Sequence, residues 1–159
     1  MTFRLVGLEA EPFQPLFALA DDELARRAIR RVVADEPFGY PCRVSLEDAR
    51  PGDELLLLSF EHQGAASPYR ASGPIFVRRG VSRATLEPGV VPESVARRLI
   101  SLRAYDAAHD IVEAEVCEGT AVADRLAHLF AAAAVRYVQL HNARRGCFSC
   151  TALRADAGR

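Results

Sequence analysis

Apolar and polar residues alternate in four segments of the C-terminal half of the chain. A period of two places successive side chains on opposite faces of a strand, so each segment predicts a strand with one apolar and one polar face. Strands of this kind suit a sheet that is covered on one side only. The four segments are 99–105, 110–117, 135–141 and 147–153.

The first two of these segments are close enough along the chain to form a hairpin, with a tight turn at 107–109. Pairing apolar with apolar residues sets the expected register of this hairpin. On that register Leu102 faces Ala114, and Arg103 faces Glu113.

Between the second and third segments, apolar residues recur at helical spacing. They are Val122, Leu126, Leu129, Phe130 and Ala133. This spacing predicts a helix over about 121–132, whose apolar stripe covers one face of the sheet. The strand–helix–strand connection is expected to be a right-handed crossover.

The N-terminal half gives shorter signals. Acidic residues followed by arginines predict a small helix at 21–27, because each charge then lies at the favourable end of the helix dipole. The apolar run at 54–60 is typical of a strand that is buried on both faces. Further strands are expected at 3–8, 31–34 and 75–77, and loops at 36–41 and 67–74.

Together these elements predict an α+β fold in a single domain of residues 1–159. We expect a mostly antiparallel sheet, with the main helix packed on one face and a short helix in the N-terminal half. A chain of this length can bury roughly 70% of the surface that its unfolded form exposes.

Composition and charge exclude several classes of partner. Half of the residues are hydrophobic and 26% are charged, which is typical of a soluble globular protein. The formal net charge of −1 gives no global attraction to nucleic acid or to an anionic membrane, so neither partner is expected. No apolar stretch approaches the ~20 residues of a membrane span.

Cysteine usage and the N-terminus favour a cytoplasmic location. The chain lacks an N-terminal apolar signal region. Its four cysteines do not make a disulfide scaffold in a chain of this size, so reduced thiols are expected.

Most of the reactive side chains lie in three stretches, each placed where an apolar run ends or a turn begins. The stretches are 40–43, 61–74 and 141–147. Such positions let a fold present polar groups without disturbing its core. The polar face of the predicted sheet contributes Ser101, Arg103, Tyr105, Gln139, His141 and Cys147. We expect the N-terminal half to fold over the edge of this sheet and to add Cys42, His62 and Arg70 to a shared cleft.

One hypothesis for the cleft is cysteine–histidine chemistry, with Cys42 as the nucleophile and His141 as its base. Arg43 follows Cys42, and a cationic neighbour favours the reactive thiolate. Asn142 or Gln139 would orient the imidazole. The alternative is structural, because a lone cysteine is more often a small apolar residue packed under a turn.

The favoured hypothesis is a pocket for a small anionic molecule. Residues 70–73 place a guanidinium, a hydroxyl and unhindered backbone N–H groups within one turn, and such donors suit a carboxylate or a phosphate. The alternatives are that Arg103 forms an ordinary cross-strand pair with Glu113 and that Arg70 organises its own loop. The expected ligand-binding residues are Arg43, His62, Tyr69, Arg70, Ser72, Arg103, Asn142 and Cys147.

Two further classes of function remain open. Two thiolates and two imidazoles suit a tetrahedral zinc site in a non-catalytic binding module. The residues that would form it are Cys42, His62, His141 and Cys147. Only His141 and Cys147 are close in sequence, so no residue is assigned as a metal ligand. The polar sheet face would alternatively bind a protein partner.

The pair Cys147 and Cys150 resembles a redox motif, but a strand argues against that function. Residues three apart on a strand point to opposite faces, so the two sulfurs diverge. Cys150 is expected in the core, on the apolar face with Phe148.

Several stretches also resemble a bacterial family of uncharacterised proteins, the domain-of-unknown-function family 1203. They are 39–49, 61–63, 67–77, 102–106, 141–143 and 146–148. The resemblance covers nearly the whole chain and implies a compact single-domain bacterial protein, with Cys147 inside the family pattern and Cys150 outside it. It implies no activity, cofactor or catalytic residue, so the cofactor stays unknown and the site hypotheses rest on the residues themselves.

Overall fold

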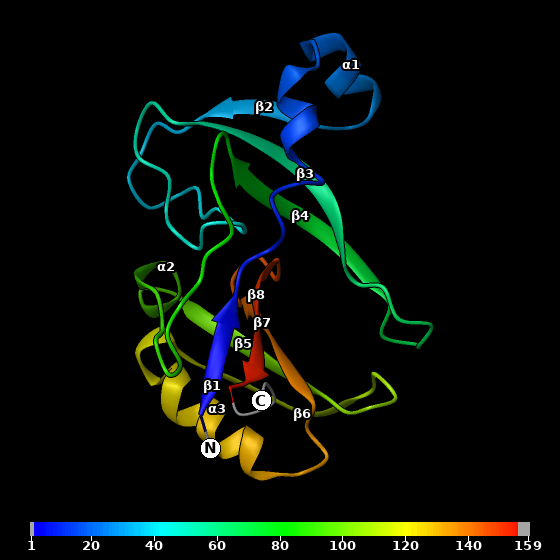
Figure 1. The fold of residues 1–159 in the computed structure, drawn as a ribbon, viewed down its shortest axis with the longest axis vertical. Coiled ribbons are helices and arrows are strands. Elements are labelled where there is room, and N and C mark those ends of the chain that lie inside the picture. The colour runs from blue at the N-terminus through cyan, green and yellow to red at the C-terminus, as the bar shows by residue number, and fades with distance from the viewer. Residues whose placement is uncertain (1, 156–159) are drawn as a thin grey trace.

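The structure of the chain, a computed structural model, describes residues 2–155. These residues form two antiparallel sheets, one above the other in Figure 1. The larger sheet has the strand order β1-β8-β7-β5-β6, and the smaller has the order β2-β3-β4. The predicted α+β class is therefore confirmed, with the strands divided between two sheets.

The five-stranded sheet combines the four strands expected in the C-terminal half with the first strand of the chain. Its members are β1 (Phe3–Val6), β5 (Leu99–Tyr105), β6 (Ile111–Glu118), β7 (Tyr137–Asn142) and β8 (Phe148–Arg154). Helix α3 (Val122–Ala131) covers one face, where Leu126 and Phe130 join Leu102 and Leu140 in one core. The main helix is thus confirmed in its predicted place.

The three-stranded sheet contains β2 (Arg30–Val33), β3 (Glu54–Gln63) and β4 (Ala71–Arg78). Leu56 and Leu58 belong to a second core, whereas Leu55 belongs to a third, so this part of β3 is buried on both faces as predicted. The shorter helices are η1 (Gln14–Ala18), α1 (Asp21–Arg26), α2 (Glu93–Ala96) and η2 (Gly119–Ala121). Within residues 2–155, no helix has the length and apolar character needed to cross a membrane.

The hairpin of β5 and β6 has a different register from the predicted one. Leu102 faces Glu115 instead of Ala114. Glu115 therefore lies on the α3 side, 3.9 Å from Arg125, while Val116 lies on the opposite face and is 60% exposed. The prediction was wrong because β6 is the outer strand of its sheet, so its apolar residues are not forced to face the core.

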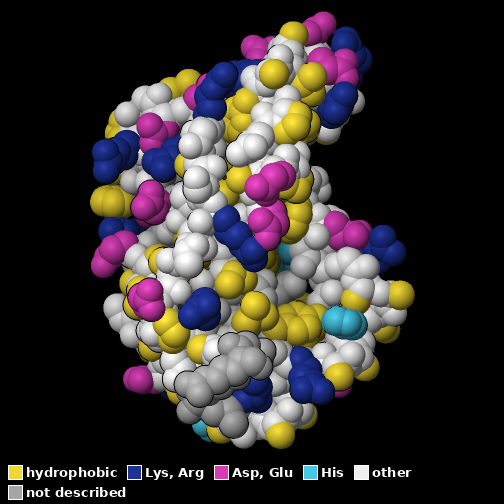
Figure 2. Space-filling view, in the orientation of Figure 1, with side chains coloured by type: hydrophobic (Ala, Val, Ile, Leu, Met, Phe, Trp, Pro, Cys, Tyr) yellow, Lys and Arg dark blue, Asp and Glu magenta, His cyan; other side chains and the backbone are white. Residues whose placement is uncertain are grey.

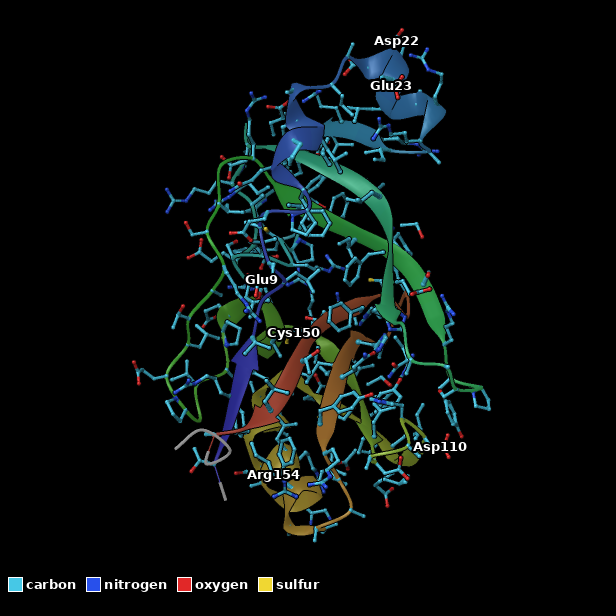
Figure 3. The ribbon with its side chains drawn as sticks, turned by 45° about the vertical axis from the view of Figure 1, so that its right-hand side comes forward. Glu9, Asp22, Glu23, Asp110, Cys150 and Arg154 are labelled. Carbon is cyan, nitrogen blue, oxygen red and sulfur yellow. The ribbon has the colours of Figure 1, made fainter. Side chains whose placement is uncertain are left out.

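The pair of β7 and β8 contains a β-bulge that was not predicted. Leu140 faces Cys150, but His141 faces Phe148, so Ser149 is an extra residue in β8. The bulge turns Phe148 into the second core, whereas Cys150 stays in the core beneath α3 (Figure 3 labels Cys150 on β8). The expectation that Phe148 and Cys150 share a face was therefore wrong, and the expectation that Cys150 is buried was correct.

The segment between β3 and β4 is shorter than the predicted loop. β3 continues to Gln63 and β4 begins at Ala71, so residues 71–74 lie on a strand rather than in the expected loop at 67–74. Pro74 is compatible with this placement because β4 is an outer strand, where a missing N–H group can face away from the sheet.

Candidate functional site

A cavity of about 400 Å³ lies between the loop at 36–43 and the turn that joins β7 to β8. Its polar lining contains four arginines, an amide and a thiol, namely Arg43, Arg98, Asn142, Arg144, Arg145 and Cys147. Glu36 contributes the one carboxylate of the lining residues that the structure describes. The cavity is therefore strongly cationic.

Arg43 is a buried charge in the wall of this cavity, with 3% of its surface exposed. Its backbone N–H donates to the carbonyl oxygen of Phe76 at 3.0 Å, which fixes the loop against β4. Its guanidinium donates to the carbonyl oxygens of Pro41 (2.5 Å) and Phe148 (2.8 Å) and to Cys147 Sγ (3.2 Å). None of these acceptors within residues 2–155 is a carboxylate.

Burial lowers the pKa of the Arg43 guanidinium, and the sulfur of Cys147 acts in the opposite direction. A guanidinium keeps its proton even so, so a positive charge lies in the wall without a carboxylate to neutralise it. A buried charge of this kind is unfavourable unless it is paired. A guanidinium has five N–H groups. Three of them donate in the contacts above, so two N–H groups of Arg43 are left for another acceptor.

The turn between β7 and β8 supplies the remaining cationic lining. Gly146 has a φ of +79°, which glycine adopts without strain, and its N–H donates to the Asn142 carbonyl oxygen at 2.7 Å. The Asn142 N–H in turn donates to the Cys147 carbonyl oxygen at 2.9 Å. This turn exposes Arg144 and Arg145, and neither has an ion-pair partner in the described part of the chain.

Cys147 is a free, partly exposed thiol between these two groups of cations. Its Sγ accepts a hydrogen bond from Arg43 Nη2 at 3.2 Å and lies 3.7 Å from Asn142 Nδ2. The sulfur therefore has two N–H neighbours and also lines the cavity.

Arg98 is fixed in place by an ion pair. Its Nη2 lies 2.6 Å from Asp48 Oδ1, and its Nη1 lies 3.2 Å from Asp48 Oδ2. The same Nη2 donates to the carbonyl oxygen of Phe38 at 2.6 Å. Arg98 thus connects the loop of the N-terminal half to the start of β5, and Asp48 neutralises its charge.

Two other cavities of similar size contain lining residues that form ion pairs. One, of about 480 Å³, is lined by Glu47 and Asp53, both of which pair with Arg78. The other, of about 490 Å³, contains Arg97, which pairs with Asp48 and Glu93. Acidic and basic side chains are also interspersed over the molecular face in Figure 2. In the cavity beside Arg43, by contrast, three of the four lining arginines, Arg43, Arg144 and Arg145, have no carboxylate partner within the described residues.

His62 and His141 meet on the polar face of the five-stranded sheet, with ring centroids 4.8 Å apart. Gln139 joins them, because its Oε1 lies 2.9 Å from His62 Nδ1 and 3.2 Å from His141 Nε2. The Gln139 Nε2 donates to the His62 carbonyl oxygen at 2.7 Å. On its other side, His141 Nδ1 lies 3.0 Å from the carbonyl oxygen of Gly146. This network links β3 to the turn that carries Cys147.

Burial lowers the pKa of His141 to about 3, and the positive charge of Arg103 adds to this effect. Burial also lowers the pKa of His62, so both rings are neutral at neutral pH. A neutral imidazole carries one N–H, yet both nitrogens of His141 face oxygen acceptors, so one contact lacks a proton. Neither nitrogen faces a cysteine sulfur in these contacts.

Cys42 lies in the second core, with 1% of its surface exposed. Its Sγ accepts hydrogen bonds from the backbone N–H groups of Ser45 (3.5 Å) and Arg78 (3.3 Å). No histidine is among its hydrogen-bond partners in the described residues. The geometry thus matches the structural alternative for Cys42, a small residue packed under a turn.

The predicted donor set at 70–73 lies outside the cavity lining. Arg70 is exposed and pairs with Glu61 at 3.1 Å, so it organises its own hairpin. Ser72 faces Glu61 in the β3–β4 pair. Tyr69 is 39% exposed and places its ring edge-on to that of Tyr105 at 6.5 Å.

Arg103 also lies outside the cavity lining, on the polar sheet face. It faces Ala114 on β6, whereas its expected partner Glu113 faces Ala104. The expected cross-strand pair was therefore wrong, for the same reason as the register. Arg103 instead lies close enough to His141 for its charge to lower the pKa of that ring.

The cavity thus collects Arg43, Asn142 and Cys147 from the predicted set and adds three arginines that were not predicted. Arg144 and Arg145 had a usable signal, because two consecutive arginines in a tight turn between strands must be exposed. Arg98 had none, because its position depends on Asp48, 50 residues earlier in the chain.

Within residues 2–155, no group of three or more His, Cys, Asp or Glu side chains is arranged to hold a metal ion. The sulfurs of Cys42 and Cys147 lie in different surroundings and both accept hydrogen bonds from N–H groups. The geometry therefore gives the zinc hypothesis no support.

Comparison with curated proteins and with solved structures gives no match. A family model described as "Protein of unknown function (DUF1203)" matches residues 39–154. The match includes Arg43, Arg98 and the whole β7–β8 turn, but not Glu36 or Phe38. Because the matched residues make up most of the chain, the protein belongs to the DUF1203 family of proteins of unknown function.

Proposed function

We propose that this protein binds a small anionic molecule in the cavity beside Arg43. The observation that carries the proposal is the buried Arg43 guanidinium, whose acceptors in the described residues are two carbonyl oxygens and a thiol. An anion that enters the cavity would supply the charge partner that the protein does not provide. Arg144 and Arg145 would hold the part of the anion nearer to solvent.

The dimensions and donors of the cavity fit a small metabolite. A volume of about 400 Å³ lies in the range of small-molecule sites. Guanidinium groups and the Asn142 amide are donors that match carboxylate and phosphate oxygens. Phe38, Phe76 and Leu99 would contact the apolar part of such a ligand.

The polar face of the five-stranded sheet is a weaker candidate for a protein-binding surface. β3 already contacts it through His62, and Gln63 Nε2 donates to the Tyr137 hydroxyl at 2.8 Å.

All four cysteines are free, which suits a reducing compartment and supports the proposed cytoplasmic location.

The proposal is tested by titrating the protein with inorganic phosphate and with aliphatic dicarboxylates from malonate to suberate in a calorimeter. We expect saturable binding of at least one of these anions, and binding should weaken with added salt because the contacts are ionic. The variant Arg144→Ala/Arg145→Ala should reduce the affinity about tenfold, as expected when two charge-assisted contacts are lost.

The matched control is Arg26→Ala/Arg27→Ala, which removes two adjacent exposed arginines, the last residue of α1 and its C-cap, and changes the net charge equally. This control should bind like the parent protein. Equal losses in both double variants would mean that the net charge, and not the cavity, governs binding. Absence of saturable binding by the parent protein would overturn the proposal.

A further inference from the structure

The two partly exposed thiols of this chain lie in opposite electrical surroundings. Cys147 lines the cationic cavity and accepts a hydrogen bond from Arg43 Nη2. Cys117, on the outer strand β6, lies near Glu115, Glu118 and Arg125; burial and the Glu115 charge raise its pKa, and Arg125 acts in the opposite direction. Cys42 and Cys150 are each 1% exposed.

A sulfur nucleophile attacks disulfides, and nearby cations stabilise the negative charge that passes between the sulfurs during exchange. Cys147 has Arg43 as a direct neighbour, and Arg144 and Arg145 line the same cavity. These cations would also attract a carboxylate on the attacking molecule and stabilise the thiolate that leaves. The same groups thus serve recognition and exchange.

We propose that Cys147 is a thiol–disulfide exchange site for low-molecular-weight disulfides that carry carboxylates. This inference rests on the proposed function, because it names the class of anion that the cavity takes. The Cys147 thiol gives its proton to water, and its sulfur forms a bond to one sulfur of the disulfide as the S–S bond breaks. Cys147 is oxidised to a mixed disulfide, the departing half is reduced and leaves as a thiolate, and that thiolate takes a proton from water. No other oxidant is required.

The three other cysteines are poorly placed to resolve the mixed disulfide, and Cys117 lies on β6, which β5 and β7 separate from β8. Cys150 lies in the core beneath α3. The bulge at Ser149 separates Cys150 from the face of β8 on which Phe148 lies. Burial raises the pKa of Cys150 to about 12, so it is a poor nucleophile as well as an inaccessible one. Cys42 is enclosed by the second core. The modification should therefore persist until an external thiol reverses it.

The experiment compares two disulfides of equal chain length and opposite charge, 3,3′-dithiodipropionate and cystamine. Intact mass and peptide mapping would follow the modification of each cysteine with time. At Cys147 the anionic reagent should react about tenfold faster than the cationic one, whereas Cys117 should show the reverse preference. Arg144→Ala/Arg145→Ala should reduce the preference at Cys147, and Arg26→Ala/Arg27→Ala should leave it unchanged.

Suberate has the same number of chain atoms and the same terminal carboxylates as dithiodipropionate, with CH₂–CH₂ in place of S–S, so it separates binding from exchange. It should protect Cys147, and not Cys117, from the neutral reagent iodoacetamide. The same charge preference at both cysteines would overturn the exchange site. If suberate binds and protects Cys147 while dithiodipropionate fails to modify it, the inference fails and the anion pocket stands. If neither of these anions binds or protects, and phosphate and the shorter dicarboxylates also show no saturable binding, the pocket itself fails.

The variant Cys147→Ser provides an independent check of the attachment point. It should lose the dithiodipropionate adduct and keep the reaction of Cys117 with cystamine, because Cys117 lies on β6, outside the cavity lining. A dithiodipropionate adduct that persists in this variant would overturn the assignment to Cys147.

Discussion

Arg43 and His141 are both removed from water, yet burial has different effects on their charges. Arg43 stays charged because a guanidinium holds its proton far above neutral pH. His141 becomes neutral, because burial and the nearby Arg103 lower its pKa to about 3. The sequence drew attention to both residues, but a residue type alone could not indicate that the one expected to act as a base is enclosed and has a pKa too low for a strong base.

His141 should make the stability of the fold depend on pH. Its pKa is about 3 in the folded protein, against an ordinary value of 6.5. Between these values the unfolded chain takes up a proton that the folded protein does not, so stability is full above pH 6.5 and falls with acidification. Chemical denaturation should show a loss of about 1 kcal/mol per pH unit from this residue.

The variant His141→Gln should lower the slope of unfolding free energy against pH between pH 6 and pH 4 by roughly the amount that corresponds to one bound proton. His128→Gln is the control, because His128 lies exposed on α3. His62, whose pKa is also lowered by burial, should leave a smaller residual slope in His141→Gln, whereas His128→Gln should keep the slope of the parent protein. An unchanged slope in His141→Gln would contradict the neutral state of His141 in the folded protein.

At the scale of secondary structure, alternation and helical spacing predicted which segments form β5, β6, β7, β8 and α3. They could not predict the register of β6, because an outer strand tolerates apolar residues on its open face. They also could not predict the bulge at Ser149, which depends on the contacts that Phe148 makes with His62 and His141. Both errors concern outer or irregular positions.

The β7–β8 turn should be sensitive to the loss of its glycine. Gly146 has a φ of +79°, and an added Cβ would meet no atom within 4 Å, so Gly146→Ala would act through backbone strain alone. We expect a loss of about 1 kcal/mol in the free energy of unfolding. Because the turn carries Arg144 and Arg145, anion affinity should fall as well.

Gly80→Ala is the matched control for this prediction. Gly80 has a φ of +72° and equally open surroundings, but it does not line the cavity beside Arg43. It should therefore lose similar stability and keep the parent affinity for anions. Equal effects of both variants on binding would show that the turn does not position the anion site.

At the scale of the whole molecule, the cavity is made by segments that are far apart in the chain. Arg43 and Cys147 are separated by 104 residues, and Arg98 and Asp48 by 50. Local patterns indicated that the N-terminal half meets the end of β7, and His62 does meet His141 there. They did not indicate which loops enclose a cavity, because that depends on how the two sheets pack together.

The ion pair of Arg98 and Asp48 should be a main link between these segments. The two side chains are 17% and 8% exposed, so removing one leaves the other charge largely buried. Asp48→Ala should lower the free energy of unfolding by about 3 kcal/mol in chemical denaturation. The adjacent Glu47→Ala is the control, because Glu47 is 67% exposed and should change stability by less than about 1 kcal/mol. Similar losses in the two variants would count against this link.

The first two strands of the chain occupy outer positions, one in each sheet. β1 pairs with β8, and β2 pairs with β3, while the family match begins only at residue 39. Without these two strands, β8 and the leucine-rich β3 would expose rows of unpaired N–H and C=O groups, which are templates for aggregation. Residues 3–33 can therefore be understood as protection against edge-to-edge association of copies, a role that leaves the chemistry of the cavity to the rest of the chain.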